Sequence, residues 1–438
     1  MKSHENIWKN CLEYCTISNL GLRRSNNQDA HAEILARDQF QWNQRGHLFI
    51  VADGMGAHAS GELASKLATD LIPLSYFKKT AVPPAESLRT SIEEANHQIH
   101  IRGNADSGHR GMGTTCDALL ILPEGAVIGH VGDSRVYRLR GTRFEQMTFD
   151  HSLLWEAQAS GKKPDGTIQK NIITRCLGVN PTVQVALEGP WELLPGDIYL
   201  LCSDGLSGQF ENHDDEMGKI LHSLPLPEAT QVLVDLANLR GGPDNITITT
   251  VKYLGTQKME KETPAELSPK NTHSPTQKNH NLKQEETVTS TIIDPSPIPV
   301  WAWTTLGILG SFTILLFLFS FQNIFIGIGA LLLLLITLIF IVLMLNMRRA
   351  PEAFSLRPLG KGPYRVFSAA CDEKITEVLY EIYKELRTSV GNQHTLKLSE
   401  ADHFAHLGKT ATTNRHYTEG CAAFCRAISS IWAQLENR

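Results

Sequence analysis

The 438-residue chain lacks features that would assign it to several protein classes. Its 46 acidic and 41 basic side chains, with a net charge of -5, show no basic footprint for nucleic acid. Eight cysteines show no close paired framework, so we expect reduced, mostly buried thiols rather than disulfides or a zinc site. Residues 1–10 have no apolar core of a secretory signal, so we expect no export by that route.

Residues 10–254 have the pattern of one α+β domain. Short apolar runs typical of buried strands recur along this region. They are Cys15–Asn19, Leu48–Ala52, Cys116–Leu122, Ala126–Val131, Ile198–Cys202 and Ile246–Val251. Two amphipathic helices are predicted between the early strands, and their apolar faces are set by four residues each. These faces are Leu63, Leu67, Leu71 and Leu74, then Leu88, Ile92, Ala95 and Ile99. Residues 153–171 are polar and predict a mobile surface excursion.

A linker and a membrane hairpin follow this domain in the sequence. Residues 255–299 are rich in proline and polar side chains and are predicted to be disordered. Residues 300–345 are apolar, and one continuous helix over them would be about 70 Å long, more than twice the thickness of a hydrocarbon core. The polar pair at 322–323 divides the block into two transmembrane helices, 300–321 and 324–345.

The flanking side chains predict how this hairpin lies in the membrane. Trp301 and Trp303 fit an interfacial belt, and Arg348 and Arg349 follow the second span. We therefore expect the inner, cytoplasmic membrane, with both the first domain and the C-terminal tail in the cytoplasm. One span plus a re-entrant segment is the alternative.

Residues 365–438 are predicted to form a small all-α domain. Ile375, Leu379 and Leu386 lie on one face of a first helix that is expected to stop at Gly391. Two further segments, at 404–411 and 420–427, resemble one tetratricopeptide-type helix pair. The tail is either a docking module for a protein partner or a hairpin with only a packing role.

Asp53 ends the apolar run Leu48–Ala52 and is followed by Gly54. A carboxylate at the end of a core strand is costly to bury unless it is paired or binds a metal ion. In isolation, Asp53-Gly54 fits either a metal ligand or an ordinary turn.

Other aspartates beside turns occur in order along the same domain. They are Asp29, Asp133, Asp204 and Asp244, and no His/Cys cluster accompanies them. Oxygen ligands favour Mg²⁺ or Mn²⁺, and two such ions close together would activate water for hydrolysis of a phosphate ester. Arg24 could hold the phosphate with two hydrogen bonds.

Five ordered motifs carry a resemblance to a known family. They are Arg24–Asp29, Asp53–Gly56, Gly111–Thr115, Val131–Arg135, and the two strand-end pairs Asp204-Gly205 and Asp244-Asn245. Together they resemble the bacterial metal-dependent serine/threonine protein phosphatases of type 2C. The resemblance implies a four-layer αββα sandwich of two antiparallel sheets, with the metal ions in a cleft at one edge.

The resemblance also implies a role for each site residue. Asp53 would bridge two Mn²⁺ or Mg²⁺ ions, with Gly54, Asp204 and Asp244 as further ligands, and Asp133 would hold a weaker third ion with Asp204. Asp29, Asn245 and Thr114 would support the site, and Arg24 would bind phosphate. The excursion at 153–171 falls where the family has a flap that gates substrate.

The implied reaction is hydrolysis of phosphoserine and phosphothreonine in proteins by a metal-bridged hydroxide. Partners would be phosphorylated proteins, including Ser/Thr kinases and their substrates at the same membrane. An inactive phosphatase fold that serves as a membrane scaffold is the alternative function.

Overall fold

The computed structural model describes residues 8, 10–56, 60–159, 161, 172–255, 335, 337, 359–391 and 398–436. The chain divides into two compact units, and the first combines Met1–Glu260 with Arg357–Arg438. The second is Lys261–Leu356. Most of the predicted linker and, apart from residues 335 and 337, both predicted membrane helices lie outside the described residues. Within the described ranges, none of the helices has both the length and the apolar character needed to cross a membrane. The hairpin therefore stays a prediction.

Two antiparallel sheets form the centre of the first unit. The first sheet has the strand order β1-β11-β10-β7-β8-β12, and the second has the order β2-β3-β5-β6-β9 with β4 paired to β3. The first contains β1 (Leu12–Asn19), β7 (Arg135–Arg140), β8 (Arg143–Gln146), β10 (Ile198–Cys202), β11 (Ile246–Tyr253) and β12 (Arg365–Ser368). The second contains β2 (Asp29–Ile34), β3 (His47–Met55), β4 (Gly113–Thr114), β5 (Cys116–Leu122), β6 (Gly125–Val131) and β9 (Ala186–Trp191).

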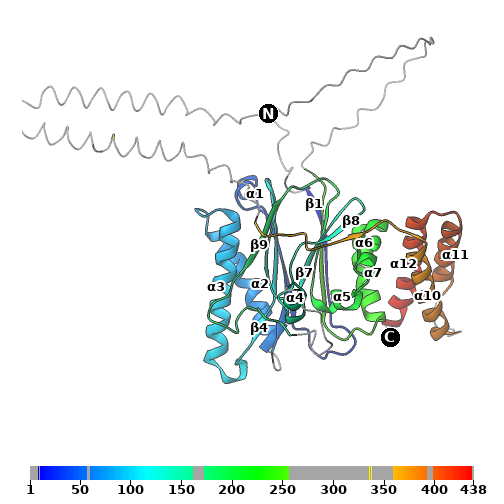
Figure 1. Ribbon diagram of the computed structural model, residues 1–438, viewed down its shortest axis with the longest axis horizontal. Coiled ribbons are helices and arrows are strands. Elements are labelled where there is room, and N and C mark those ends of the chain that lie inside the picture. Colours follow the sequence, from blue (N-terminus) through cyan, green and yellow to red (C-terminus); the bar gives the residue numbers. More distant parts are fainter. Residues whose placement is uncertain are drawn as a thin grey trace, which may run out of the picture. The chain divides into compact units, whose positions relative to one another are not determined.

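Helices cover the outer faces of both sheets, as Figure 1 shows. The helices α2 (Ser60–Lys78) and α3 (Pro84–Ala105) lie on the second sheet, and α6 (Asp214–Ser223) and α7 (Leu226–Leu239) lie on the first. Three shorter helices are α1 (Gln39–Arg45), α4 (Leu153–Ala159) and α5 (Asp204–Ser207), with 3-10 turns at Ser107–His109 and Gly208–Phe210. The predicted sandwich of two antiparallel sheets with outer helices is confirmed.

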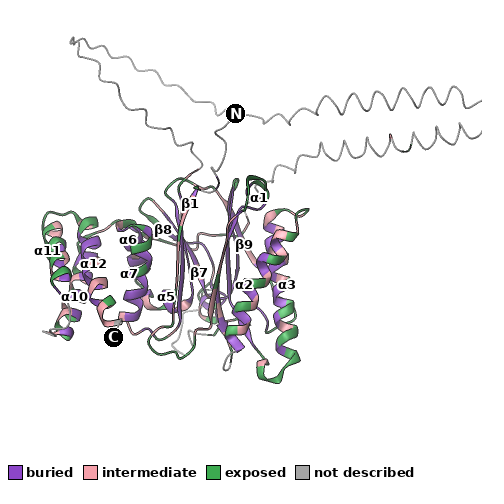
Figure 2. Ribbon diagram, turned by 180° about the vertical axis from the view of Figure 1, so that it is seen from behind, coloured by how far each residue is buried: buried purple, intermediate pink, exposed green. Residues whose placement is uncertain are grey.

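The core lies between the two sheets, where apolar side chains from both inner faces are buried (Figure 2). Phe49, Val51, Leu119 and Ile121 come from the second sheet, and Val136, Tyr199, Leu201 and Val251 come from the first. These residues alternate with outward-facing ones along their strands, as expected for a face-to-face sandwich. All six predicted strands are present.

The predicted contact face of α2 is wrong by about one position. Leu74 is exposed, and Leu63, Leu67 and Leu71 are only partly buried. The buried side is instead made largely of small residues: Ala64, Ser65, Ala68 and Thr69, followed by Ile72 and Tyr76. Small side chains let the helix approach the sheet closely. This close packing, rather than the spacing of the leucines, determines which face of α2 is buried. The face predicted for α3 is confirmed.

The C-terminal segment differs from the separate domain predicted at 365–438. Its helices are α10 (Glu373–Val390), α11 (Ser399–Thr413) and α12 (Tyr417–Glu436), and they belong to the same compact unit as the sandwich. β12 pairs with β8, and α12 packs on α6 and α7 as an additional layer (Figure 1). Ion pairs link Arg426 to Glu228 and Lys219 to Asp372. The helix pair is confirmed, whereas its tetratricopeptide character stays a prediction.

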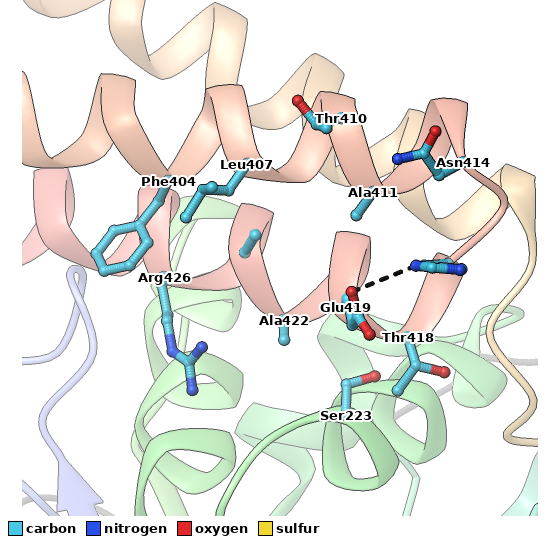
Figure 3. Close-up of a pocket in the computed structure, with 12 residues that line it drawn as sticks. Ser223, Phe404, Leu407, Thr410, Ala411, Asn414, Thr418, Glu419, Ala422 and Arg426 are labelled. Carbon is cyan, nitrogen blue, oxygen red and sulfur yellow. Dashed lines mark ion pairs between the residues drawn. The ribbon is translucent and has the colours of Figure 1, made fainter.

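An open groove of about 490 Å³ lies beside α11 and α12 (Figure 3). Phe404, Leu407, Ala411 and Ala422 give it an apolar side, and Ser223 comes from the end of α6. Glu419 at its rim pairs with His416 over 3.6 Å.

The shared core predicts that damage to α12 reaches the sandwich. Phe424 is 2% exposed and packs against Gly408 and Tyr380. F424A removes a buried aromatic ring and should lower the free energy of unfolding by about 3–5 kcal/mol. Hydrogen exchange should become faster in α6 and α7 as well as in α10–α12, because these helices share one core cluster.

L407A is the matched control, because Leu407 is 44% exposed on α11 and should cost less than about 1 kcal/mol. Faster exchange confined to α10–α12 in the F424A protein would show an independent tail and contradict the single unit.

Candidate active site

Asp53 lies at the end of β3, where the buried strand leaves the core. It is the register partner of Asp29 on β2, so two carboxylates are cross-strand neighbours. Thr115 binds both polar groups of the Asp53 backbone: its Oγ1 accepts from the Asp53 N–H at 2.8 Å, and its N–H donates to the Asp53 carbonyl at 2.8 Å. Thr114 Oγ1 donates to the same carbonyl at 2.9 Å. These contacts fix the backbone and leave the Asp53 carboxylate for other partners.

Asp204 and Asp244 are brought together by two neighbouring strands. β10 pairs with β11 in antiparallel fashion, so the residue after β10 lies beside the residues before β11. Gly205 makes this approach possible, because a Cβ there would overlap the carbonyl oxygen of Asn245. Ser203 Oγ, one residue before Asp204, donates to Asp29 Oδ2 at 2.8 Å. The ends of β2, β3, β10 and β11 therefore share one site.

The side chain of Asn245 holds the loop that contains Arg24 against this site through three hydrogen bonds. Its Nδ2 donates to the carbonyls of Leu20 and Asn26, and its Oδ1 accepts from the Gln28 N–H at 2.9 Å. The loop places Arg24 Nη2 at 2.6 Å from Asp244 Oδ2, with 48% of the arginine side chain exposed. A guanidinium group thus faces solvent at the edge of the carboxylate cluster.

Burial and mutual repulsion raise the pKa of four of these aspartates. Burial is the larger cause for each. It raises the pKa of Asp29 to about 6, with added repulsion from Asp204 and Asp244. It raises the pKa of Asp133 to about 7, with repulsion from Asp204 and Asp150. The pKa of Asp53 lies well above its ordinary value, and its charge interacts with those of the other four aspartates. The pKa of Asp204 is raised as well, by burial and by Asp244.

The chemistry of this donor set fits divalent cations. Among the described residues, no three carboxylate, imidazole or thiol side chains already converge in a geometry that would hold an ion. Asp244 contacts Arg24 instead. However, Asp29, Asp53, Asp133, Asp204 and Asp244 together carry up to five negative charges, and Arg24 is the cation paired with them. Hard cations with oxygen ligands are the partners that would offset this repulsion.

The structure brings together all of the predicted site residues. Asp29, Asp53, Asp204, Asp244 and Asp133 interact electrostatically, and Arg24, Asn245 and Thr114 contact members of this set or their loops. Gly54 follows Asp53 and donates its N–H to the Gln28 carbonyl at 3.1 Å. Their roles as ligands stay predictions. Part of the predicted excursion, residues 160 and 162–171, lies outside the described residues.

Sequence reasoning missed the hydroxyl groups that hold the site in place. Thr115 Oγ1 is 2.7 Å from Ser134 Oγ, next to Asp133, and Ser203 links Asp29 to β10. In the sequence, the feature that could have pointed to Ser134 and Ser203 is that each stands next to one of the aspartates. Asp117, a carboxylate within the apolar strand β5, is fully buried and pairs with His130 Nδ1 at 2.5 Å, so it belongs to a neighbouring polar network.

Comparison with known proteins agrees with this geometry. A family model described as protein phosphatase 2C matches residues 23–238. Protein phosphatase PhpP of Streptococcus pneumoniae is 35% identical over 250 residues, which cover 55% of this chain and 97% of that protein. Serine/threonine phosphatase stp of Listeria monocytogenes is 39% identical over 221 residues, covering 48% and 86%. The crystal structure of Stp1 from Staphylococcus aureus is similar with a TM-score of 0.50 and 29% identity, covering 56% and 96%.

The raised pKa values predict how metal ions and pH act on stability. Asp29 and Asp133 keep their protons up to about pH 6 and about pH 7 in the folded chain, whereas an unfolded aspartate releases its proton near pH 4. Their stabilising contribution is therefore complete below about pH 4 and lost as the pH rises through 6 to 7. A Mn²⁺ ion held by Asp133 would replace its proton and would also offset the charge of the neighbouring Asp29, so Mn²⁺ should raise the melting temperature more at about pH 7.5 than at about pH 5.

Scanning fluorimetry of the full chain, with EDTA or with Mn²⁺ at each pH, measures this difference. D53N should show a smaller rise with Mn²⁺, whereas D70N, an exposed substitution on α2, should behave as wild type. An equal rise at both pH values would contradict the assignment of Asp133 as a metal ligand.

Proposed function

This chain belongs to the protein phosphatase 2C family and is a protein serine/threonine phosphatase, and from that premise we propose that its aspartate cluster hydrolyses phosphoserine and phosphothreonine in proteins. The observation that carries the proposal is the convergence of five aspartates and Arg24 at one end of the two sheets. Phosphoryl groups are bound and transferred mainly by positioned positive charge, which this cluster would gather.

The proposed ligands of two Mn²⁺ or Mg²⁺ ions are Asp53, Asp204, Asp244 and the carbonyl of Gly54. Asp133 and Asp204 would hold a third, weaker ion. When bound, such ions lower the pKa of water in the site, which supplies a nucleophile for attack on phosphorus at neutral pH. Asp29 supports this arrangement through Ser203, which ties it to the end of β10.

Arg24 is the proposed phosphate-binding residue. Its guanidinium offers two parallel N–H donors to phosphate oxygens, and its position on a loop fastened by Asn245 keeps it beside the aspartates. In the structure it pairs with Asp244 over 2.6 Å. Binding of a cation by Asp244 would release Arg24 for the phosphate.

We further propose that residues 300–345 place this phosphatase at the cytoplasmic face of a membrane. The sequence supplies the two apolar spans, and the fold adds a topological argument. Residues before and after the block belong to one compact unit, and an even number of crossings would return the chain to the side of the membrane that it left. Two spans meet this condition, whereas one span plus a re-entrant segment does not. Ser/Thr kinases and their substrates at that membrane are the proposed partners.

The catalytic proposal predicts a near-complete loss of activity in D53N. The substitution keeps the shape of the side chain and removes the central charge, so activity on a phosphothreonine peptide with Mn²⁺ should fall by at least about 100-fold. Phosphate release by the full chain is the measurement, because residues 1–254 alone lack β12 and the helices that complete the unit.

D70N serves as the matched control, since Asp70 pairs with Lys66 on the exposed side of α2. Residual activity of D53N within tenfold of wild type would rule out the aspartate cluster as the catalytic site.

The membrane proposal predicts that the chain fractionates with membranes and resists carbonate extraction. Epitope tags at both ends should be protected from protease in intact spheroplasts and cleaved after lysis, because both ends are on the cytoplasmic side. Replacement of residues 300–345 by a glycine-serine linker of equal length should release an active phosphatase into the soluble fraction. Cleavage of one tag in intact spheroplasts would contradict the two-span arrangement.

A further inference from the structure

Residues 359–368, termed here the return segment, connect the edges of the two sheets. Leu359 bridges to Gly189 on β9, at one edge of the second sheet. The N–H of Tyr364 then donates to the Gln146 carbonyl at 2.8 Å, and β12 continues along β8 at the edge of the first sheet. The segment therefore crosses from one sheet to the other on the side where both would otherwise be open.

A buried carboxylate fixes the path of the return segment. Glu188 on β9 is 2% exposed and accepts from the Gly362 N–H at 3.0 Å and from the Tyr364 hydroxyl at 2.5 Å. Gly360 has a φ of +73° and a Cβ there would overlap the Glu188 carboxylate, so only glycine fits. These contacts determine where the next residue, Arg365, can lie.

Arg365 contacts the indole ring of Trp155, which belongs to α4. The guanidinium carbon lies 4.1 Å from the ring centroid, a distance at which a cation is attracted to an aromatic face. Trp155 is 8% exposed and also packs edge-on against Phe149 at 5.2 Å. Phe149 in turn contacts Tyr364 at 5.4 Å. The only short helix between β8 and β9 in the described residues is thus held by the return segment.

The segment that carries α4 borders the aspartate cluster at both of its ends. It leaves the core where the His151 N–H donates to the Gly132 carbonyl at 2.7 Å, next to Asp133. It returns where Leu177 and Thr114 exchange two backbone hydrogen bonds of 2.8 and 3.1 Å. The described ends of this segment therefore lie beside the loops that carry Asp133 and Asp53.

A second contact of Trp155 links it to the base of the site. The guanidinium carbon of Arg135 lies 5.6 Å from the same indole ring. Arg135 donates to Asp150 at 2.7 Å and is two residues from Asp133. A continuous set of contacts therefore joins Arg365 to the loop of Asp133 through Trp155 and Arg135.

We propose that Arg365 is a positioning residue that acts through Trp155 to set the place of α4 beside the aspartate cluster, and thereby the affinity for phosphoprotein substrates. The inference rests on the proposed binding of substrate at that cluster. Arg365 does not touch the reacting atoms. It lies beyond residue 238, where the match to the family model ends, so the contact is an addition made by this chain's C-terminal segment.

The test compares R365M with R365K in the full chain, on a phosphothreonine peptide and on p-nitrophenyl phosphate. R365M removes the cation but keeps an unbranched side chain, and should raise KM for the peptide by about three- to tenfold with kcat within about twofold. The small substrate has no peptide chain that could contact α4, so its KM should be unchanged. R365K retains a cation over the ring and should restore most of the peptide affinity.

K409M is the matched control, because it removes a cation 4.6 Å from the Tyr380 ring in the same C-terminal segment, away from α4. It should leave both substrates unaffected. A W155L protein should lose affinity for the peptide as R365M does. The double variant W155L/R365M should have a peptide KM no higher than that of W155L, because both substitutions remove the same contact.

Three results would overturn the inference. The first is an unchanged peptide KM in R365M. The second is an equal loss of affinity for both substrates together with a lower melting temperature. The third is additive effects of W155L and R365M on the peptide KM. A wild-type chain inactive on both substrates would overturn the proposed function and this inference with it. An active wild type with an unchanged R365M overturns this inference alone.

Discussion

The structure depends on keeping several negative charges buried close together at one end of the two sheets. Burial raises the pKa of Asp53, Asp133 and Asp29, so the folded chain without a bound cation keeps their protons to a higher pH than an exposed aspartate does. The sandwich must therefore hold these side chains against their own repulsion. It does so at the ends of strands whose inner parts are buried in an apolar core. The burial of these apolar side chains offsets the unfavourable free energy of holding the aspartates close together.

Hydrogen bonds to the backbone, rather than to the carboxylates, do most of the positioning. Thr115 satisfies both polar groups of the Asp53 main chain, and Asn245 satisfies three main-chain groups of the loop that carries Arg24. These contacts are all made with the backbone, so none of them occupies the Asp53 carboxylate. Two carboxylates do receive hydrogen bonds: Ser203 donates to Asp29 and thereby ties β2 to β10, and Arg24 donates to Asp244.

The site could be predicted from the sequence because each aspartate ends an apolar run or follows a turn, and because the motifs occur in a known order. The elements that the sequence did not predict correctly, namely β7, the buried face of α2 and β12, lack such signals. β7 carries Arg135, Arg138 and Arg140, whose charges are neutralised by Asp150, Glu145 and Asp197 from other segments, so its pattern did not predict a strand. The α2 face depends on Ala64 and Ala68, which carry little hydrophobic signal. β12 pairs with a strand more than 200 residues earlier, and local pattern contains no information about such a partner.

The place of the C-terminal segment also constrains the rest of the chain. A tail joined by a disordered linker could lie on either side of a membrane, but β12 and α12 are parts of the same unit as β8, α6 and α7. Both ends of the 261–356 insertion therefore start from one folded body. The insertion follows β11 in the chain and is followed by the return segment, whose path is fixed by Glu188 and by pairing with β8. Because the return segment contacts Trp155, the C-terminal part of this folded unit is joined to the surroundings of the aspartate cluster through Arg365.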